Sequence, residues 1–166
     1  MIVLALDIAL RNTGWSIFEN DLLLSWGLLS IPRSASGYVT ADRGKDAAIL
    51  ASYLAPMLDG VDRVVAEFPT GGRSAVAVMS MFISIGVVIG LTKKVGVPLI
   101  AILPREAKRR VLGNSCATKG EVMEWARREY PGELFFAAKN KFEHIADSLL
   151  IHHASRVDLR SGGFVL

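Results

Sequence analysis

The order of the apolar segments restricts the folds that this chain can adopt. The predicted strands are residues 2–8, 15–18, 22–30, 63–68 and 98–103, and the first three are joined by the turn-forming sequences Asn12-Thr13-Gly14 and Asn20-Asp21. The predicted helices are residues 41–58, 75 to about 94, a short helix from 104, 118–130 and 139–155. A meander followed by β-α-β crossovers predicts an α/β domain, with a mixed five-stranded sheet flanked by helices.

The composition fits one folded domain. The chain has 166 residues, of which 51% are hydrophobic and 21% charged, which supplies a core and excludes global disorder. We expect one domain over residues 1–155 and an irregular tail over 156–166. Residues 1–6 lack a basic region and lead directly into Asp7, so they do not resemble a signal peptide. The single cysteine, Cys116, excludes an intrachain disulfide and favours a cytoplasmic location.

The uncharged run at residues 75–91 approaches the length of a membrane span. A span here would place Asp7 and Glu67 on the opposite side of a membrane from Asp147, although all three acids are expected to belong to one site. We therefore predict no membrane contact, and a helix that is either buried in the core or part of a dimer interface. Small residues that would let two such helices approach across a two-fold axis are Ser80, Ser84, Gly86 and Gly90.

Two carboxylates stand among apolar residues. Asp7 lies within Leu-Ala-Leu-Asp-Ile-Ala-Leu, and Glu67 lies at the end of Arg-Val-Val-Ala-Glu. Burying an isolated carboxylate is costly unless it is paired or bound to a cation. Asp7 could instead pair with Arg11 or cap the following turn, and Glu67 could be a solvated strand end. We favour a shared cation-binding role for the two acids.

The last predicted helix adds a histidine and a third acid. His144 and Asp147 project from one helical face because they are three positions apart. His144 could also be a hydrogen-bonded core histidine. Glu143, four residues before Asp147, could also reach the site, but we expect it to be solvated. Together these oxygen and nitrogen donors favour Mg²⁺ or Mn²⁺, with two ions held by Asp7, Glu67, His144 and Asp147. No GxxxxGK[ST], CxxC or HExxH motif is present to suggest another chemistry.

Four segments resemble the RuvC family of Holliday-junction resolvases, which belongs to the ribonuclease-H-like superfamily. They are LALDIALRNTGWSIF, VVAEFPTGGRSA, KRRVLGNSCATKGEV and HIADSLLIHH, and the resemblance covers about residues 1–154. It implies a ribonuclease-H-like fold and a homodimeric, metal-dependent endonuclease that cuts branched DNA by phosphodiester hydrolysis. The catalytic residues that it implies are Asp7, Glu67, His144, Asp147 and Lys119, of which the first four are metal ligands.

The resemblance also implies where DNA binds. Lys108 and Lys119 match lysines that the family uses near the scissile phosphate, and basic residues crowd the second half of a chain with net charge +3. Phe68 would replace an aromatic wedge that the family carries slightly further along. The expected DNA-binding residues are Lys108, Arg109, Arg110, Lys119, Phe68 and Arg73.

Some features depart from the family pattern. Position 144 is a histidine where many relatives have aspartate, and the polar segment at 33–45 is longer than expected. The pattern is most similar to the phage-type branch, which implies a phage gene expressed in a bacterial host. Two other functions stay open: a phosphotransferase or ATPase of the actin-like superfamily, and a nucleic-acid-binding module of the same fold without catalysis.

Overall fold

The computed structural model describes residues 1–32, 37–68, 71, 74–132, 139–156 and 164–165. Its strands are β1 (Ile2–Asp7), β2 (Asn12–Glu19), β3 (Leu22–Ser30), β4 (Arg63–Glu67), β5 (Leu99–Ile102) and β6 (Phe164–Val165). Its helices are α1 (Val39–Met57), α2 (Ala75–Val95), α3 (Pro104–Leu112), α4 (Lys119–Glu129) and α5 (Lys139–Arg156). The predicted order of strands and helices is confirmed, with small shifts at their ends.

The described strands form one mixed sheet in the order β3-β2-β1-β4-β5-β6. The meander β1-β2-β3 is antiparallel, whereas β4 runs parallel to β1 and β5 parallel to β4. Asn20 and Asp21 both have positive φ values, 49° and 70°, which is the backbone of a tight hairpin turn. The predicted mixed sheet with flanking helices is therefore confirmed, although it has six strands where five were expected. The expectation of a wholly irregular tail is wrong, because β6 pairs antiparallel with β5.

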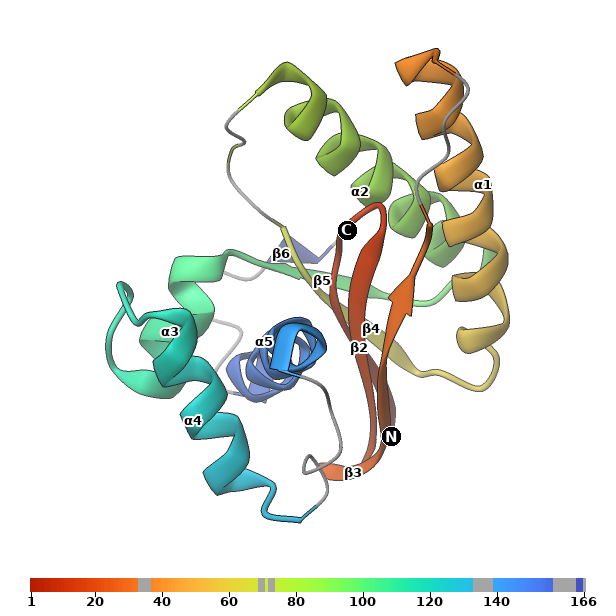
Figure 1. Cartoon of the computed structure of the whole chain (residues 1–166). Coiled ribbons are helices and arrows are strands. Elements are labelled where there is room, and N and C mark those ends of the chain that lie inside the picture. Colours follow the sequence, from red (N-terminus) through yellow and green to blue (C-terminus); the bar gives the residue numbers. More distant parts are fainter. Residues whose placement is uncertain (33–36, 69–70, 72–73, 133–138, 157–163, 166) are drawn as a thin grey trace.

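Helices cover both faces of the sheet (Figure 1). On one face, Leu50 and Leu54 of α1 pack against Leu4 and Leu6 of β1, and α2 lies against α1. On the other face α5 crosses the strands β2, β1 and β4, and α3 and α4 pack against its outer side. Alternate residues of β1 thus enter two separate cores, as the two-residue period of a strand requires.

Helix α2 is only partly covered by the rest of the chain. Its length and composition would suffice to cross a membrane, and 22% of its most apolar window is buried. However, the two strands that it connects, β4 and β5, are adjacent and parallel in one sheet. A span would have to place them on opposite sides of a membrane, so the fold argues against one. The helix is not the fully buried core helix that we considered, since Phe82, Gly86 and Gly90 are exposed.

Candidate active site

The carboxylates of β1 and β4 meet because the two strands are in register. Asp7 and Glu67 are direct partners in the parallel pair, each at the last position of its strand. Val3 of β1 and Val65 of β4 face the core that contains α5. Since side chains alternate along a strand, Asp7 and Glu67 point to that same face. Strand register therefore places both acids beneath α5.

Close packing of α5 on β2 brings its polar residues to these acids. A Cβ built on Gly14 would lie 2.0 Å from the carbonyl oxygen of His144, so only glycine permits the approach at this point. The buried Ser148 hydroxyl donates a hydrogen bond of 3.1 Å to Ser16 Oγ, which fixes the same helix to the same strand. As a result, His144 Nδ1 lies 2.7 Å from Asp7 Oδ2. His144 thus belongs to the acidic site and is not a separate core histidine.

Burial and mutual repulsion raise the proton affinity of the acids. Burial, followed by the charges of Asp7 and Asp147, raises the pKa of Glu67 well above its usual value. Burial and the charges of Asp7 and Glu143 raise the pKa of Asp147 to about 7, whereas Lys108 acts in the opposite direction. The hydrogen bond to Asp7 raises the pKa of His144. Such a group of carboxylates favours protons or cations as partners.

Arg11 is not the partner of Asp7. Its Nε donates a hydrogen bond of 2.8 Å to the fully buried Asp46, which also accepts one of 3.1 Å from Arg43. The turn after Asp7 is stabilised by Thr13, whose hydroxyl donates to the carbonyl of Ala9 at 2.6 Å. Asp46 is therefore the partner of Arg11, and Thr13 stabilises the turn. Neither of the two alternative roles considered for Asp7 is observed.

Both predicted active-site lysines lie near the acids, held by different acceptors. Lys108 Nζ donates a hydrogen bond of 2.7 Å to the carbonyl of Ala117, and its charge lowers the pKa of both Glu67 and Asp147. Lys119 forms an ion pair with Glu143, the residue before His144. The expectation that Glu143 is merely solvated is therefore wrong. The sequence gives only a weak indication of this ion pair. Glu143 precedes Asp147 by about one helical turn, which predicts that it can reach the site but does not indicate its partner.

The other predicted DNA contacts have different surroundings. The side chain of Arg110 is 5% exposed. It donates hydrogen bonds to Glu106 at 2.8 Å and to the carbonyl of Ala154 at 3.1 Å, so it connects α3 to α5, which does not favour a phosphate contact. Arg109 is 60% exposed and pairs with Glu106. Phe68 is partly buried against the α1–α2 core, which does not favour a wedge role. Arg73 lies outside the described residues.

The donor set fits hard divalent cations, although the ligands are not yet gathered around one point. Among the described residues, no three His, Cys, Asp or Glu side chains stand close enough to hold one ion as they are arranged. The chemistry nevertheless fits: three carboxylates and one imidazole are the donors that Mg²⁺ and Mn²⁺ accept, and their repulsion would be relieved by positive charge. The residues that could hold such ions are Asp7, Glu67, His144 and Asp147.

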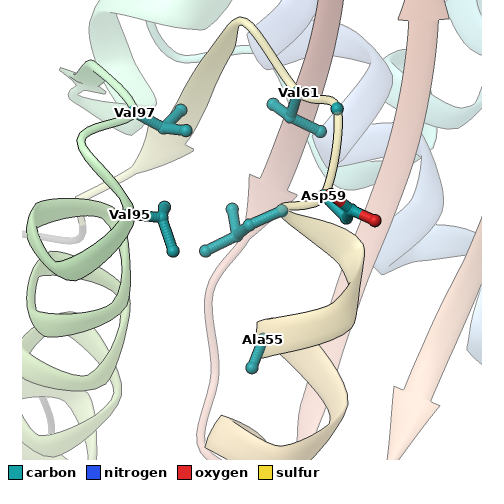
Figure 2. Close-up of a pocket in the computed structure, with 7 residues that line it drawn as sticks. Ala55, Asp59, Val61, Val95 and Val97 are labelled. Atoms are coloured by element: carbon teal, nitrogen blue, oxygen red, sulfur yellow. The ribbon is translucent and has the colours of Figure 1, made fainter.

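A cavity of about 440 Å³ lies elsewhere, between the ends of α1 and α2 (Figure 2). Val61 precedes β4, so this cavity is at the opposite edge of the sheet from Glu67. Asp59 is the only charged residue in its lining. The cavity is therefore separate from the carboxylate site.

The fold and the acidic site define a ribonuclease-H-like domain with its carboxylates at adjoining strand ends. No protein-family model matches the chain. A curated crossover junction endodeoxyribonuclease RuvC from Akkermansia muciniphila is 28% identical over 130 residues, which cover 74% of this chain and 73% of the relative.

Two solved structures of RuvC from Thermus thermophilus cover 100% of this chain. The structure in complex with a Holliday junction substrate has a TM-score of 0.78 at 19% identity, over 99% of that chain. A second has a TM-score of 0.70 at 21% identity, over 100% of that chain. These comparisons confirm the resemblance to the RuvC family, and they show the RuvC fold over the whole chain.

Proposed function

We propose that this protein is a metal-dependent endonuclease that cuts branched DNA such as Holliday junctions. The observation that carries the proposal is the pairing of Asp7 with Glu67 at adjacent strand ends, facing His144 and Asp147. The similarity to a crossover junction endodeoxyribonuclease, and to a RuvC solved with a Holliday junction, supports the substrate class. The proposal also places the protein inside the cell, where its DNA substrate is.

The four residues Asp7, Glu67, His144 and Asp147 would hold two divalent ions, Mg²⁺ or Mn²⁺. When bound, such ions activate water and stabilise the negative charge that develops on the phosphate. The chain itself contributes a rigid frame: the sheet register fixes the two strand acids, and Gly14 and Ser148 fix α5 above them.

Lys108 and Lys119 would stabilise the scissile phosphate. Lys119 is 70% exposed at the first position of α4 and lies in the field of Asp7 and Asp147, which helps to raise its pKa and keep it charged. Arg109 on α3 extends the basic surface outward. Phosphate contacts of this kind position DNA without reading its sequence, so the proposed contact set favours recognition of DNA shape.

The proposal includes a homodimer that associates through α2. Phe82, Gly86 and Gly90 are exposed and spaced four residues apart, so they form one stripe along the helix. Phe82 is 63% exposed, which is unfavourable for a large aromatic side chain in water. A dimer would present two sites to a two-fold symmetric junction. The actin-like alternative is not favoured, because the RuvC fold accounts for the full chain.

The central test is the loss of cleavage in Asp7→Asn and Glu67→Gln. Each variant should cleave a synthetic four-way junction at least about 100-fold more slowly, because a metal-binding carboxylate is removed. Junction affinity, measured in a chelator, should be retained, because the two carboxylates are negatively charged and do not attract the phosphates of DNA. Asp59→Asn, at the opposite edge of the sheet, is the matched control and should cleave normally. Near-normal cleavage by either site variant would contradict the proposal.

A further inference from the structure

An ion pair joins α4 to α5 beside the acidic site. Lys119 Nζ donates to Glu143 Oε1. Glu143 is 27% exposed and immediately precedes His144, whose imidazole bonds Asp7. The glutamate is thus at the rim of the site, between the proposed metal ligands and solvent.

The backbone of Lys119 is itself held in place. Thr118 caps α4 in a reciprocal capping box with Glu121, which fixes the first turn of the helix. The loop just before this cap is tied to α3, because Lys108 Nζ donates to the carbonyl of Ala117. With its main chain fixed, the remaining freedom of Lys119 is in its four-carbon side chain, which carries a large rotamer entropy.

The ion pair with Glu143 places the Lys119 ammonium beside the residue that precedes His144. The hydrogen bond that Lys119 donates to Glu143 is the main cause that raises the pKa of Lys119, and the charges of Asp147 and Asp7 raise it further. The ion pair therefore holds the ammonium toward the site.

We propose that Glu143 is a positioning residue, which orients the Lys119 ammonium toward the scissile phosphate. This inference rests on the proposed nuclease function. An ammonium has three N–H donors, so Lys119 can keep its bond to Glu143 and still donate to phosphate oxygens. The carboxylate restricts the rotamers of the lysine before DNA arrives, and this reduces the entropy lost in the transition state.

The same carboxylate has an opposite effect on DNA affinity. Its negative charge repels the phosphate backbone of the DNA. Removing the charge should therefore slow the chemical step without weakening junction binding. A residue needed only for folding would not produce such a separation of kcat from affinity.

The test uses Glu143→Gln, Lys119→Gln and the double variant, with Glu124→Gln as the matched control. Glu124 is exposed on the same helix as Lys119, so the control removes one negative charge from the same region. The kcat for a four-way junction and the junction Kd in a chelator are measured for each protein. Thermal unfolding checks that each variant is folded.

Glu143→Gln should lower kcat by between about 10-fold and 100-fold, the cost of misplacing a reacting group. Its junction Kd should be unchanged or smaller, and Glu124→Gln should keep normal kcat. The double variant should be no slower than Lys119→Gln, because Glu143 acts through that lysine.

A normal kcat for Glu143→Gln would overturn the inference, and so would losses of kcat that multiply in the double variant. The proposed function would survive either result if Asp7→Asn still abolished cleavage. If the wild-type protein cleaves no branched DNA, the proposed function fails and the inference with it.

Discussion

The ionisation of Asp147, an acid largely removed from water, should make the free energy of unfolding depend on pH and on bound cations. Its pKa of about 7 in the folded protein compares with an ordinary value of 3.8. Between about pH 4 and pH 7 the unfolded chain releases this proton while the folded chain retains it. The free energy of unfolding of the metal-free protein should therefore fall as pH rises through this window, and stay low above it.

Asp147→Asn should stabilise the metal-free protein at pH 8. An amide carries no charge to bury, so we expect a gain of roughly 1–3 kcal/mol in the free energy of unfolding, measured by urea denaturation in a chelator. The wild-type protein should gain stability when Mn²⁺ is added, and the variant should gain much less. Asp59→Asn should show neither effect. A variant less stable than wild type at pH 8 would contradict the assignment.

His144 should set both metal preference and the acid limit of activity. An imidazole suits Mn²⁺ better than Mg²⁺, so cleavage should be faster in Mn²⁺. A proton competes with the metal for this ligand, and the bond to Asp7 raises the pKa of His144. Cleavage at limiting metal should therefore begin to fall while the pH is still above about 6.5, and approach a tenfold loss per pH unit below the pKa.

His144→Asp should narrow the difference between the two metals and weaken, without removing, the acid-side loss, because Asp147, with its pKa of about 7, still binds a proton in this range. Cleavage rates in Mg²⁺ and Mn²⁺ from about pH 5.5 to 8.5 provide the measurement. Identical metal preference and pH profiles for the two proteins would show that His144 is not a ligand.

Gly14 determines the distance between α5 and the sheet. In Gly14→Ala the new Cβ would meet the His144 backbone, and α5 would have to move away from β2. We expect a loss of about 1–3 kcal/mol in the free energy of unfolding, together with impaired cleavage because His144 leaves Asp7. Gly44→Ala in α1, where a Cβ would meet no atom within 4 Å apart from the adjacent backbone of its own helix, should be neutral or slightly stabilising. Equal behaviour of the two variants in unfolding and cleavage assays would contradict this account.

The sequence predicts the elements well because their signals are local. The turn at Asn20-Asp21 and the capping box at Thr118 were recognisable from neighbouring residues, and both are present. Asp7 and Glu67 could be assigned to one site because an acid in an apolar strand is costly unless it is satisfied. Whether these residues bind metal stays a prediction.

Contacts between distant elements were beyond such reasoning. The residues around Arg110 in the sequence do not indicate that its guanidinium reaches the carbonyl of Ala154. From sequence alone, Arg110 is therefore predicted to contact DNA. Likewise, the pair between Lys119 and Glu143 depends on how α4 packs against α5. The short strand β6 was missed because two residues carry no detectable period.

At the scale of the whole molecule, the exposed stripe on α2 should control assembly. Phe82→Lys or Gly86→Glu should shift the protein from dimer to monomer in sedimentation at micromolar concentration, since a charge cannot be buried unpaired in an interface. The monomers should nick one strand without coordinated cutting of the second. Ser84 is unsuitable for this test because it is fully buried, and a charge there would disrupt the fold. A monomeric wild-type protein would exclude the dimer.

The central position of α5 also has a consequence for synthesis. The chain is made from its N-terminus, and domains fold as their residues become available. Asp7 and Glu67 emerge early, but His144 and Asp147 come from α5, which is translated after β1, β4 and β5. An unfinished chain therefore holds half of the proposed ligand set, and its β1 and β4 lack the helix that covers them. The proposed nuclease therefore cannot cut DNA before α5 has been translated and has packed on the sheet.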